Sequence, residues 1–185
     1  MHIIDLRPEH ERLIEQCAAL LVEAFQENWP NAWPTLDDAR EEVHEFFAPD
    51  RIIRVALAAD ETALGWIGGV ENYDGRVWEL HPLAVSPAQQ GRGIGRALVT
   101  DLEAQVAARG GLALWLGTDD ENNLTSLGGV DLYPDPLAHL ANLKNLRRHP
   151  FEFYQKLGFV ITGVVPDANG FGKPDIHMAK RVNPQ

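Results

Sequence analysis

The sequence predicts a mixed α/β fold, in which a single mixed and mostly antiparallel sheet is flanked by helices. Helical periodicity comes first in the chain, short apolar runs separated by turn residues follow it, and a second helical stretch precedes the last strand-like runs. At 185 residues the chain has an ordinary length for one folding unit with a sizeable core. We therefore expect a single domain over residues 1–185.

Two amphipathic helices are predicted near the start of the chain. Apolar residues recur at helical spacing from Glu9 to Phe25 and again from Thr35 to Phe47. Thr35 suits the N-cap position, and Asp37 and Asp38 place negative charge in the first turn, where the helix dipole favours it. The second helix is therefore expected to begin directly after Thr35.

Three short strands are predicted next. They are the apolar runs Ile52–Ala58, Ala63–Val70 and Val77–Val85, with turn residues between them. Runs of this length joined by tight turns are typical of an antiparallel meander. Pro82 lies inside the third run, and a proline there indicates a bulge or an irregular edge.

The period changes again after the third strand. A helix is predicted from Ile94 to Arg109, ending at the C-cap signal Gly110-Gly111. The continuously apolar segment Leu112–Leu116 predicts a strand that is buried on both faces beside a parallel neighbour. Three closing elements follow: a short helix over Phe151–Leu157 and strands over Phe159–Val165 and Ile176–Lys180.

Charge narrows the range of partners. The formal net charge is −11, so we expect no nucleic acid as a ligand. The polar tract from Gly117 to Leu140 contains several acids and no Lys or Arg; it predicts a long loop and a candidate for the active site. Its acids either keep the surface solvated or attract a polycation.

Other features favour ordinary packing. No apolar run is long enough to span a bilayer and no signal segment is evident, so we expect a soluble, cytoplasmic protein with no membrane partner. Cys17, the single cysteine, lies on the apolar face of the first helix and is interpreted as a core residue. The histidines show no metal-ligand spacing, so no metal is expected.

The most informative segment is LAVSPAQQGRGIGR, residues 83–96, in which a strand passes through a glycine-rich turn into a helix. Glycines allow close approach to a phosphate, and the helix N-terminus favours an anion. The spacing matches neither G-x-G-x-x-G nor a P-loop. Instead, Gln90-x-x-Gly93-x-Gly95 after this strand resembles the acetyl-CoA signature of the GNAT superfamily of N-acetyltransferases.

This resemblance implies the GNAT fold and acetyl-CoA as co-substrate. The backbone of Leu83, Ala84 and Val85 would pair with the pantetheine amides. The pyrophosphate would be held by N–H groups of the turn, at Gln90, Gly91, Arg92, Gly93, Ile94, Gly95 and Arg96. The later motif Phe153-Tyr154-x-Lys156-x-Gly158-Phe159 resembles the last helix of the superfamily, where the matching tyrosine, Tyr154, lies near the thioester sulfur and can protonate the leaving thiolate.

Further stretches resemble one family, the aminoglycoside 6'-N-acetyltransferases. They are Trp78–Leu83, Leu116–Asp120, Asp131–Tyr133, His149–Tyr154, Pro166–Gly170 and Lys173–Ile176. The resemblance implies Glu79 as the base that removes a proton from the attacking amine, and a general base of this kind contributes about 10²–10⁴-fold. His81 is a rival base. Alternation along the strand predicts that Glu79, His81 and Leu83 share one face.

The resemblance also implies an acceptor pocket that binds a cationic amine. Besides Glu79, its residues would be Tyr73, Asn122 and either Trp29 or Trp33, with Asp119 and Asp120 close by. A homodimer is implied as well. Two alternatives remain open: acetylation of a polyamine or a protein amine, and a non-enzymatic domain that senses acetyl-CoA.

Overall fold

The computed structural model describes residues 1–183, and the chain divides into two compact units. The first unit contains residues 1–114 with 182–183, and the second contains residues 115–181. The seven strands of the described residues are assigned to one sheet, whose neighbouring strands within each unit are antiparallel wherever a register is defined. The predicted α/β class with a mostly antiparallel sheet is confirmed.

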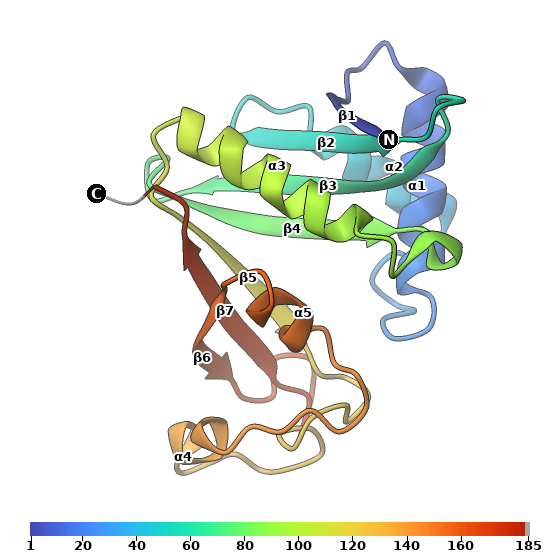
Figure 1. Ribbon diagram of the computed structural model, residues 1–185. Helices are drawn as coiled ribbons and strands as arrows, with labels where there is room; N and C mark the ends of the chain where they lie inside the picture. Colours follow the sequence, from blue (N-terminus) through green and yellow to red (C-terminus); the bar gives the residue numbers. More distant parts are fainter. Residues whose placement is uncertain (184–185) are drawn as a thin grey trace. The chain divides into compact units, whose positions relative to one another are not determined.

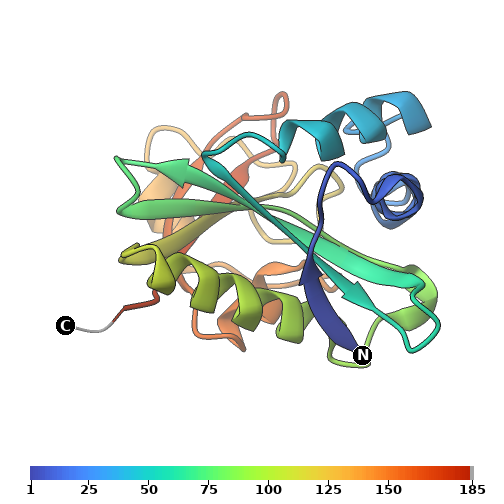
Figure 2. The same cartoon turned by 90° about the horizontal axis from the view of Figure 1, so that it is seen from above.

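The first unit has helices on both faces of an antiparallel meander (Figures 1 and 2). Its strands lie in the order β1-β2-β3-β4, with α1 and α2 on one face and α3 on the other. The elements are β1 (His2–Asp5), α1 (Glu11–Phe25), α2 (Leu36–Glu45), β2 (Arg51–Leu57), β3 (Ala63–Asn72), β4 (Val77–Val85), the 3-10 turn η1 (Pro87–Gln89) and α3 (Ile94–Ala108). Strand β1 was not predicted, because four residues are too few to establish a period.

The core under α1 and α2 surrounds a buried indole. Trp66 is completely buried, and its Nε1 donates a hydrogen bond to the carbonyl oxygen of Cys17 at 3.0 Å. Cys17 itself is fully buried, and this burial raises the pKa of its thiol. The interpretation of Cys17 as a packing residue is therefore confirmed.

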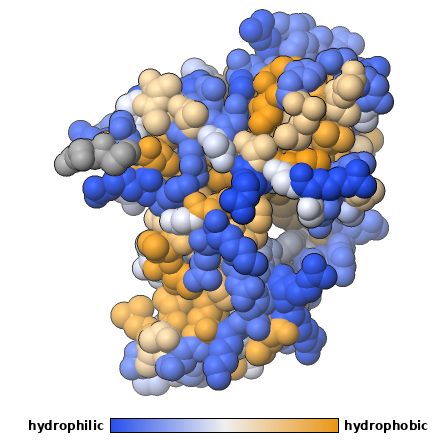
Figure 3. All heavy atoms as spheres, in the orientation of Figure 1, coloured by the Kyte–Doolittle hydropathy of each residue, from blue (hydrophilic) through white to orange (hydrophobic). Residues whose placement is uncertain are grey.

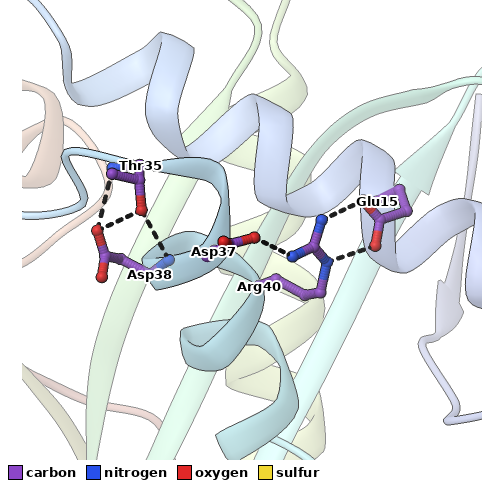
Figure 4. Close-up of polar contacts among 5 residues, drawn as sticks. All are labelled: Glu15, Thr35, Asp37, Asp38 and Arg40. Atoms are coloured by element: carbon purple, nitrogen blue, oxygen red, sulfur yellow. Dashed lines mark hydrogen bonds and ion pairs between the residues drawn. The ribbon is translucent and has the colours of Figure 1, made fainter.

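Helix α2 begins where the sequence predicts (Figure 4). The Thr35 hydroxyl accepts a hydrogen bond from the Asp38 backbone N–H at 3.2 Å, and the Asp38 carboxylate accepts one from the Thr35 N–H at 3.1 Å. This reciprocal capping box stabilises the first turn. Arg40 then bonds Glu15 of α1 through two nitrogens, at 2.6 and 2.9 Å, so α2 is fixed against α1.

The second unit contains β5, β7 and β6, in that order across the sheet, and two short helices. Its elements are β5 (Ala113–Asp119), α4 (Pro136–Ala141), α5 (Phe151–Gln155), β6 (Val160–Val165) and β7 (Asp175–Arg181), with β5 starting just before the boundary between the units. Burial alternates along β5, since Leu114 and Leu116 are buried whereas Gly117 is exposed. The prediction that this strand is buried on both faces was therefore wrong. One face is only half-buried, and Trp115 on that face makes the run look continuously apolar in the sequence. The Trp115 ring packs against His177, with ring centroids 5.4 Å apart.

The segment predicted as a structureless loop contains more order than expected. Asp135 caps α4 by accepting a hydrogen bond from the Ala138 N–H at 3.1 Å. Thr125 and Asn145 form an isolated antiparallel bridge. Within residues 1–183, no helix is both long and apolar enough to cross a membrane.

Candidate active site

The glycine-rich turn leaves its backbone open. Gly91 and Gly93 have φ values of +76° and +84°, and a Cβ built on either would meet no atom within 4 Å. Residues other than glycine rarely adopt such positive φ values. Gly93 is the N-cap of α3, and its carbonyl accepts the hydrogen bond of Ala97 N–H at 3.0 Å. The empty space beside both glycines is suited to a ligand that touches the backbone.

Positive charge is concentrated at this turn. The backbone N–H groups of Ile94, Gly95 and Arg96 belong to the first turn of α3, where no carbonyl lies four residues earlier within the helix. Arg92 and Arg96 are both exposed. Neither guanidinium forms an ion pair in the part of the chain that the structure describes. Donors aimed outward, the helix dipole and two free cations are what an anionic pyrophosphate requires.

Strand β4 contains the irregularity expected at Pro82. Ile67 of β3 lies opposite Leu83, whereas Gly69 lies opposite Leu80, so β4 has one extra residue at this point. Two residues against one is a β-bulge. Gly68 lies opposite the bulge, and an added Cβ there would come within 2.2 Å of the His81 carbonyl oxygen. The bulge therefore requires glycine on the neighbouring strand.

The bulge changes which residues share a face. Residues directly opposite one another in an antiparallel pair point to the same side. Glu79 lies opposite Val70 and Leu83 opposite Ile67; because Val70 and Ile67 are three residues apart, their side chains point to opposite faces. Val70 packs against the core under α1 and α2. The prediction that Leu83 shares a face with Glu79 was wrong, because a simple alternation does not hold across a bulge.

His81 contacts an aromatic and acidic cluster that the sequence analysis missed. Its Nε2 lies 3.6 Å from Oε1 of Glu42, a residue of α2. The other oxygen, Oε2, accepts a hydrogen bond from Trp33 Nε1 at 3.1 Å. The Trp33 and His81 rings lie 5.8 Å apart. The sequence offers only a weak sign of this role of Glu42, namely that its carboxylate lies beside the apolar stripe formed by Ala39 and Val43.

The two tryptophans have different surroundings. Trp33 contacts His81 and packs edge-on against Phe25, with ring centroids 4.8 Å apart. Trp29 packs against the same Phe25 at 5.6 Å, and its buried Nε1 has no acceptor among the described residues. Trp33 is thus the one that reaches the strand carrying Glu79. Tyr73, at the turn between β3 and β4, is 76% exposed and accessible to a ligand.

Tyr154 belongs to the second unit. It lies in α5, and its ring packs against Phe153 and Phe159, with centroids 5.1 and 5.7 Å away. Burial raises the pKa of its phenol above the ordinary value. The phenol of Tyr154 is therefore neutral in this structure.

Asp120 has a structural environment. It is completely buried, and one oxygen accepts a hydrogen bond from Leu124 N–H at 2.6 Å. The other accepts from both the N–H and the hydroxyl of Thr125, at 2.8 and 2.7 Å. A carboxylate occupied by three internal donors organises its own loop, and the contact of Asp120 with an acceptor stays a prediction.

Asp119 and Asn122 flank this network. A carboxylate oxygen of Asp119 accepts a hydrogen bond from the Asn169 side chain, and its carbonyl oxygen lies 3.0 Å from Nε2 of His149. His149 is almost fully buried, and burial lowers its pKa. Asn122 lies in the loop that follows. In residues 1–183, no group of three or more His, Cys, Asp or Glu side chains is arranged to hold a metal ion.

A bulged strand, an open glycine-rich turn and a helix that begins at the turn define an α/β fold that presents backbone donors to an anionic cofactor. The chain belongs to the acetyltransferase (GNAT) family, which matches residues 15–128. The predicted superfamily and the acetyltransferase class of enzyme are confirmed. No curated protein sequence matches the chain.

Solved structures extend the likeness over the whole chain. An aminoglycoside 6'-N-acetyltransferase complexed with coenzyme A is 40% identical, with 100% of this chain and 99% of that chain covered and a TM-score of 0.90. The aminoglycoside 6'-N-acetyltransferase from Enterococcus faecium is 40% identical with the same coverage and a TM-score of 0.88. An aminoglycoside 6'-acetyltransferase type Ii is 36% identical over 100% of this chain and 99% of that one, with a TM-score of 0.74.

Proposed function

We propose that this protein, acting as one catalytic domain, transfers the acetyl group of acetyl-CoA to the 6'-amino group of an aminoglycoside. The observation that carries the proposal is the full-length similarity, at 40% identity, to an aminoglycoside 6'-N-acetyltransferase whose structure contains coenzyme A. The open turn before α3 supports the same conclusion, because it offers unoccupied donors and cations to a pyrophosphate.

In this proposal the turn from Gln90 to Arg96 binds the pyrophosphate, and the backbone of Leu83, Ala84 and Val85 pairs with the pantetheine arm. A backbone N–H at or near Val85 polarises the thioester carbonyl, as oxyanion donors do. The amine nitrogen then attacks the carbonyl carbon. The new C–N bond forms, the C–S bond breaks, and coenzyme A leaves as the thiolate.

Three proton transfers accompany the reaction: the ammonium loses one proton before attack, its nitrogen loses a second as the amide forms, and the leaving thiolate gains one. The second proton, passed through solvent, restores the phenol that protonates the thiolate, so one proton is released overall. Glu79, directly or through a water molecule, takes the proton that the attacking ammonium must lose. Its half-exposed position on the face of β4 that also carries His81 supports this role. His81 is the rival base, and its contact with Glu42 is the observation that keeps it in consideration.

Tyr154 is proposed to protonate the leaving thiolate. Tyr154→Phe keeps the ring that packs on Phe153 and Phe159 but removes the hydroxyl, so we expect about a tenfold or greater loss in the rate of chemistry with acetyl-CoA affinity retained. Single-turnover measurements report this step even where product release limits kcat. Wild-type single-turnover rates in this variant would exclude the acid role.

The acceptor is a polycation in this proposal. The residues proposed to bind it are Trp33, Tyr73 and Glu79, and the family resemblance adds Asp119, Asp120 and Asn122. The decisive experiment is steady-state acetylation across aminoglycosides, polyamines and basic peptides, followed by thiol release. Drugs with a 6'-amine should react, whereas 6'-hydroxyl analogues should not. Efficient acetylation of spermidine or a peptide with none of a 6'-amino drug would overturn the assignment.

A homodimer, a cytoplasmic location and a role in antibiotic resistance complete the proposal. The dimer is supported by β6, the last strand in the order of its unit, which leaves Val160 and Val165 62% and 42% exposed. Apolar side chains at the surface of the second unit are evident in Figure 3. Light scattering of the purified protein tests the dimer, and drug susceptibility of cells that express it tests resistance.

A further inference from the structure

Glu42 joins three segments of the first unit. It belongs to α2, its Oε2 accepts the indole N–H of Trp33 from the connection between α1 and α2, and its Oε1 faces the imidazole of His81 on β4. Phe25 of α1 supports the Trp33 ring from another side. One carboxylate therefore connects an aromatic side chain to the strand that carries Glu79.

The position of Glu42 is fixed by the helix that carries it. Figure 4 shows how the helix is anchored, with the capping box of Thr35 and Asp38 at its start and the Arg40 guanidinium reaching Glu15 of α1. Farther along α2, Val43 is fully buried in the core. With both ends of this stretch held, the backbone at Glu42 is fixed relative to α1 and the core.

A carboxylate at this position costs desolvation free energy. The Glu42 side chain is only 19% exposed and lies beside the buried residues Ala39 and Val43. Partial burial of a charge costs free energy unless hydrogen bonds or opposite charges offset it. An apolar side chain would fill the flank of the helix without that cost, so the requirement for an acceptor here comes from Trp33 and His81.

We propose that Glu42 is a positioning residue of the acceptor site, which fixes the Trp33 indole against His81 on the face of β4 that carries Glu79. This inference rests on the proposed function, since it assumes that the amine is bound on that face. Glu42 holds the Trp33 indole in one orientation and so determines the orientation in which the acceptor binds. It takes no proton from the substrate.

The test separates positioning from charge. Glu42→Ala should raise the KM for a 6'-amino aminoglycoside about tenfold, with kcat changed less than about threefold, because an interaction that seats the substrate is lost and the chemical groups remain. Glu42→Gln keeps an amide oxygen that can accept the Trp33 N–H, so its KM should stay within about threefold of wild type. Trp33→Phe keeps a ring but no donor, and it should reproduce the higher KM.

Two controls complete the design. Glu41→Ala removes the same charge from the exposed neighbouring position and should leave KM unchanged. Acetyl-CoA affinity, measured by calorimetry, should be the same in all variants. A wild-type KM in Glu42→Ala would overturn the proposal, and so would a Glu42→Gln variant as impaired as Glu42→Ala, since charge would then be the cause. Should Glu42→Ala fail to fold, Glu42→Leu decides in its place, because leucine fills the same flank of α2 without offering an acceptor to Trp33.

The outcome for Glu42 is distinguishable from the outcome for the proposed function. If the wild-type enzyme acetylates no aminoglycoside, the proposed function fails before any variant is compared. If the wild type acetylates a drug and the Glu42 and Trp33 variants bind that drug normally, only the positioning role fails.

Discussion

The glycine-rich turn and the acidic segment after β5 are equally prominent in the sequence, yet the structure treats their charged groups in opposite ways. At the turn, Arg92 and Arg96 are exposed and Gly93 faces empty space. After β5, Asp120 is buried and bonded to three internal donors. The comparison teaches that polar groups left open to a ligand distinguish a binding segment from a structural one, whereas charge density does not.

The largest effect should come from the strand that leads into the turn. Glu79→Gln keeps size and hydrogen bonding but cannot accept a proton, so kcat at neutral pH should fall about 10²–10⁴-fold and the acidic limb of the pH–rate profile should disappear. The free energy of unfolding should hardly change, because Glu79 is half-exposed. His81→Ala is the matched control. If the histidine is the base, His81→Ala should lose kcat and the acidic limb of the profile, and Glu79→Gln should keep both.

The next effect should be on cofactor binding at the turn itself. Gly93→Asp places a side chain and a negative charge where the pyrophosphate is proposed to lie, so acetyl-CoA affinity should fall roughly 100-fold or more, about 2.7 kcal/mol. Gly110→Asp is a close control, since Gly110 has φ +82° and equally empty surroundings just past the other end of α3. Gly110→Asp should lose more stability than Gly93→Asp, because its charge lies at the C-terminal end of α3, where the helix dipole disfavours it, so CoA affinity is compared in the folded proteins. Calorimetry that finds equal CoA affinity in both would remove the turn from the cofactor site.

In the acidic segment the expectation is reversed. Asp120→Ala leaves the N–H groups of Leu124 and Thr125 without their acceptor, so the free energy of unfolding should fall by about 2–4 kcal/mol. Below the melting temperature, the acceptor KM of the folded enzyme should stay within about threefold of wild type. A large rise in KM with unchanged stability would show that Asp120 binds the acceptor after all.

The smallest effect is a pH dependence of stability from His149. Its ring accepts a hydrogen bond from Phe151 N–H at Nδ1, and its Nε2 is thus left to donate to the Asp119 carbonyl oxygen, which describes a neutral imidazole. Because burial lowers the pKa in the folded state, the unfolded chain binds the proton more readily. Stability is therefore complete above the unfolded value of 6.5 and is lost as pH falls below it. Urea unfolding of wild type and His149→Gln at pH 5 and pH 7.5 should show a smaller loss in the variant.

Much of the fold was predictable, because its signals are local. The capping box at Thr35, the end of α3 at Gly110 and the irregularity at Pro82 each depend on a few neighbouring residues. The faces of β4 were not predictable, since a bulge is defined by pairing with another strand. Even positions from Trp78 to Ala84 are buried on both sides of the bulge, so the sequence alternation gives no sign of the change.

The candidate site shows the same division. The turn could be found from its glycine spacing, because its ligand would be held by the backbone of consecutive residues. Glu42 could not, since its role depends on Trp33 and His81, which meet it only after folding. The internal hydrogen bonds of Asp120 could not be predicted, because a carboxylate in a polar tract has the same appearance in sequence whether it faces solvent or closes a loop.

The extra residue in β4 depends on glycine at position 68. No side chain fits at Gly68, because the His81 carbonyl oxygen and the Phe46 ring already fill that space. Loss of the extra residue in β4 would remove only the clash with the carbonyl oxygen, since the Phe46 ring would still fill the space. Gain of the extra residue in a lineage with a larger residue at this position would be blocked. Among relatives, glycine at this site and the inserted residue should be inherited together, as a covarying pair that neither strand would reveal by itself.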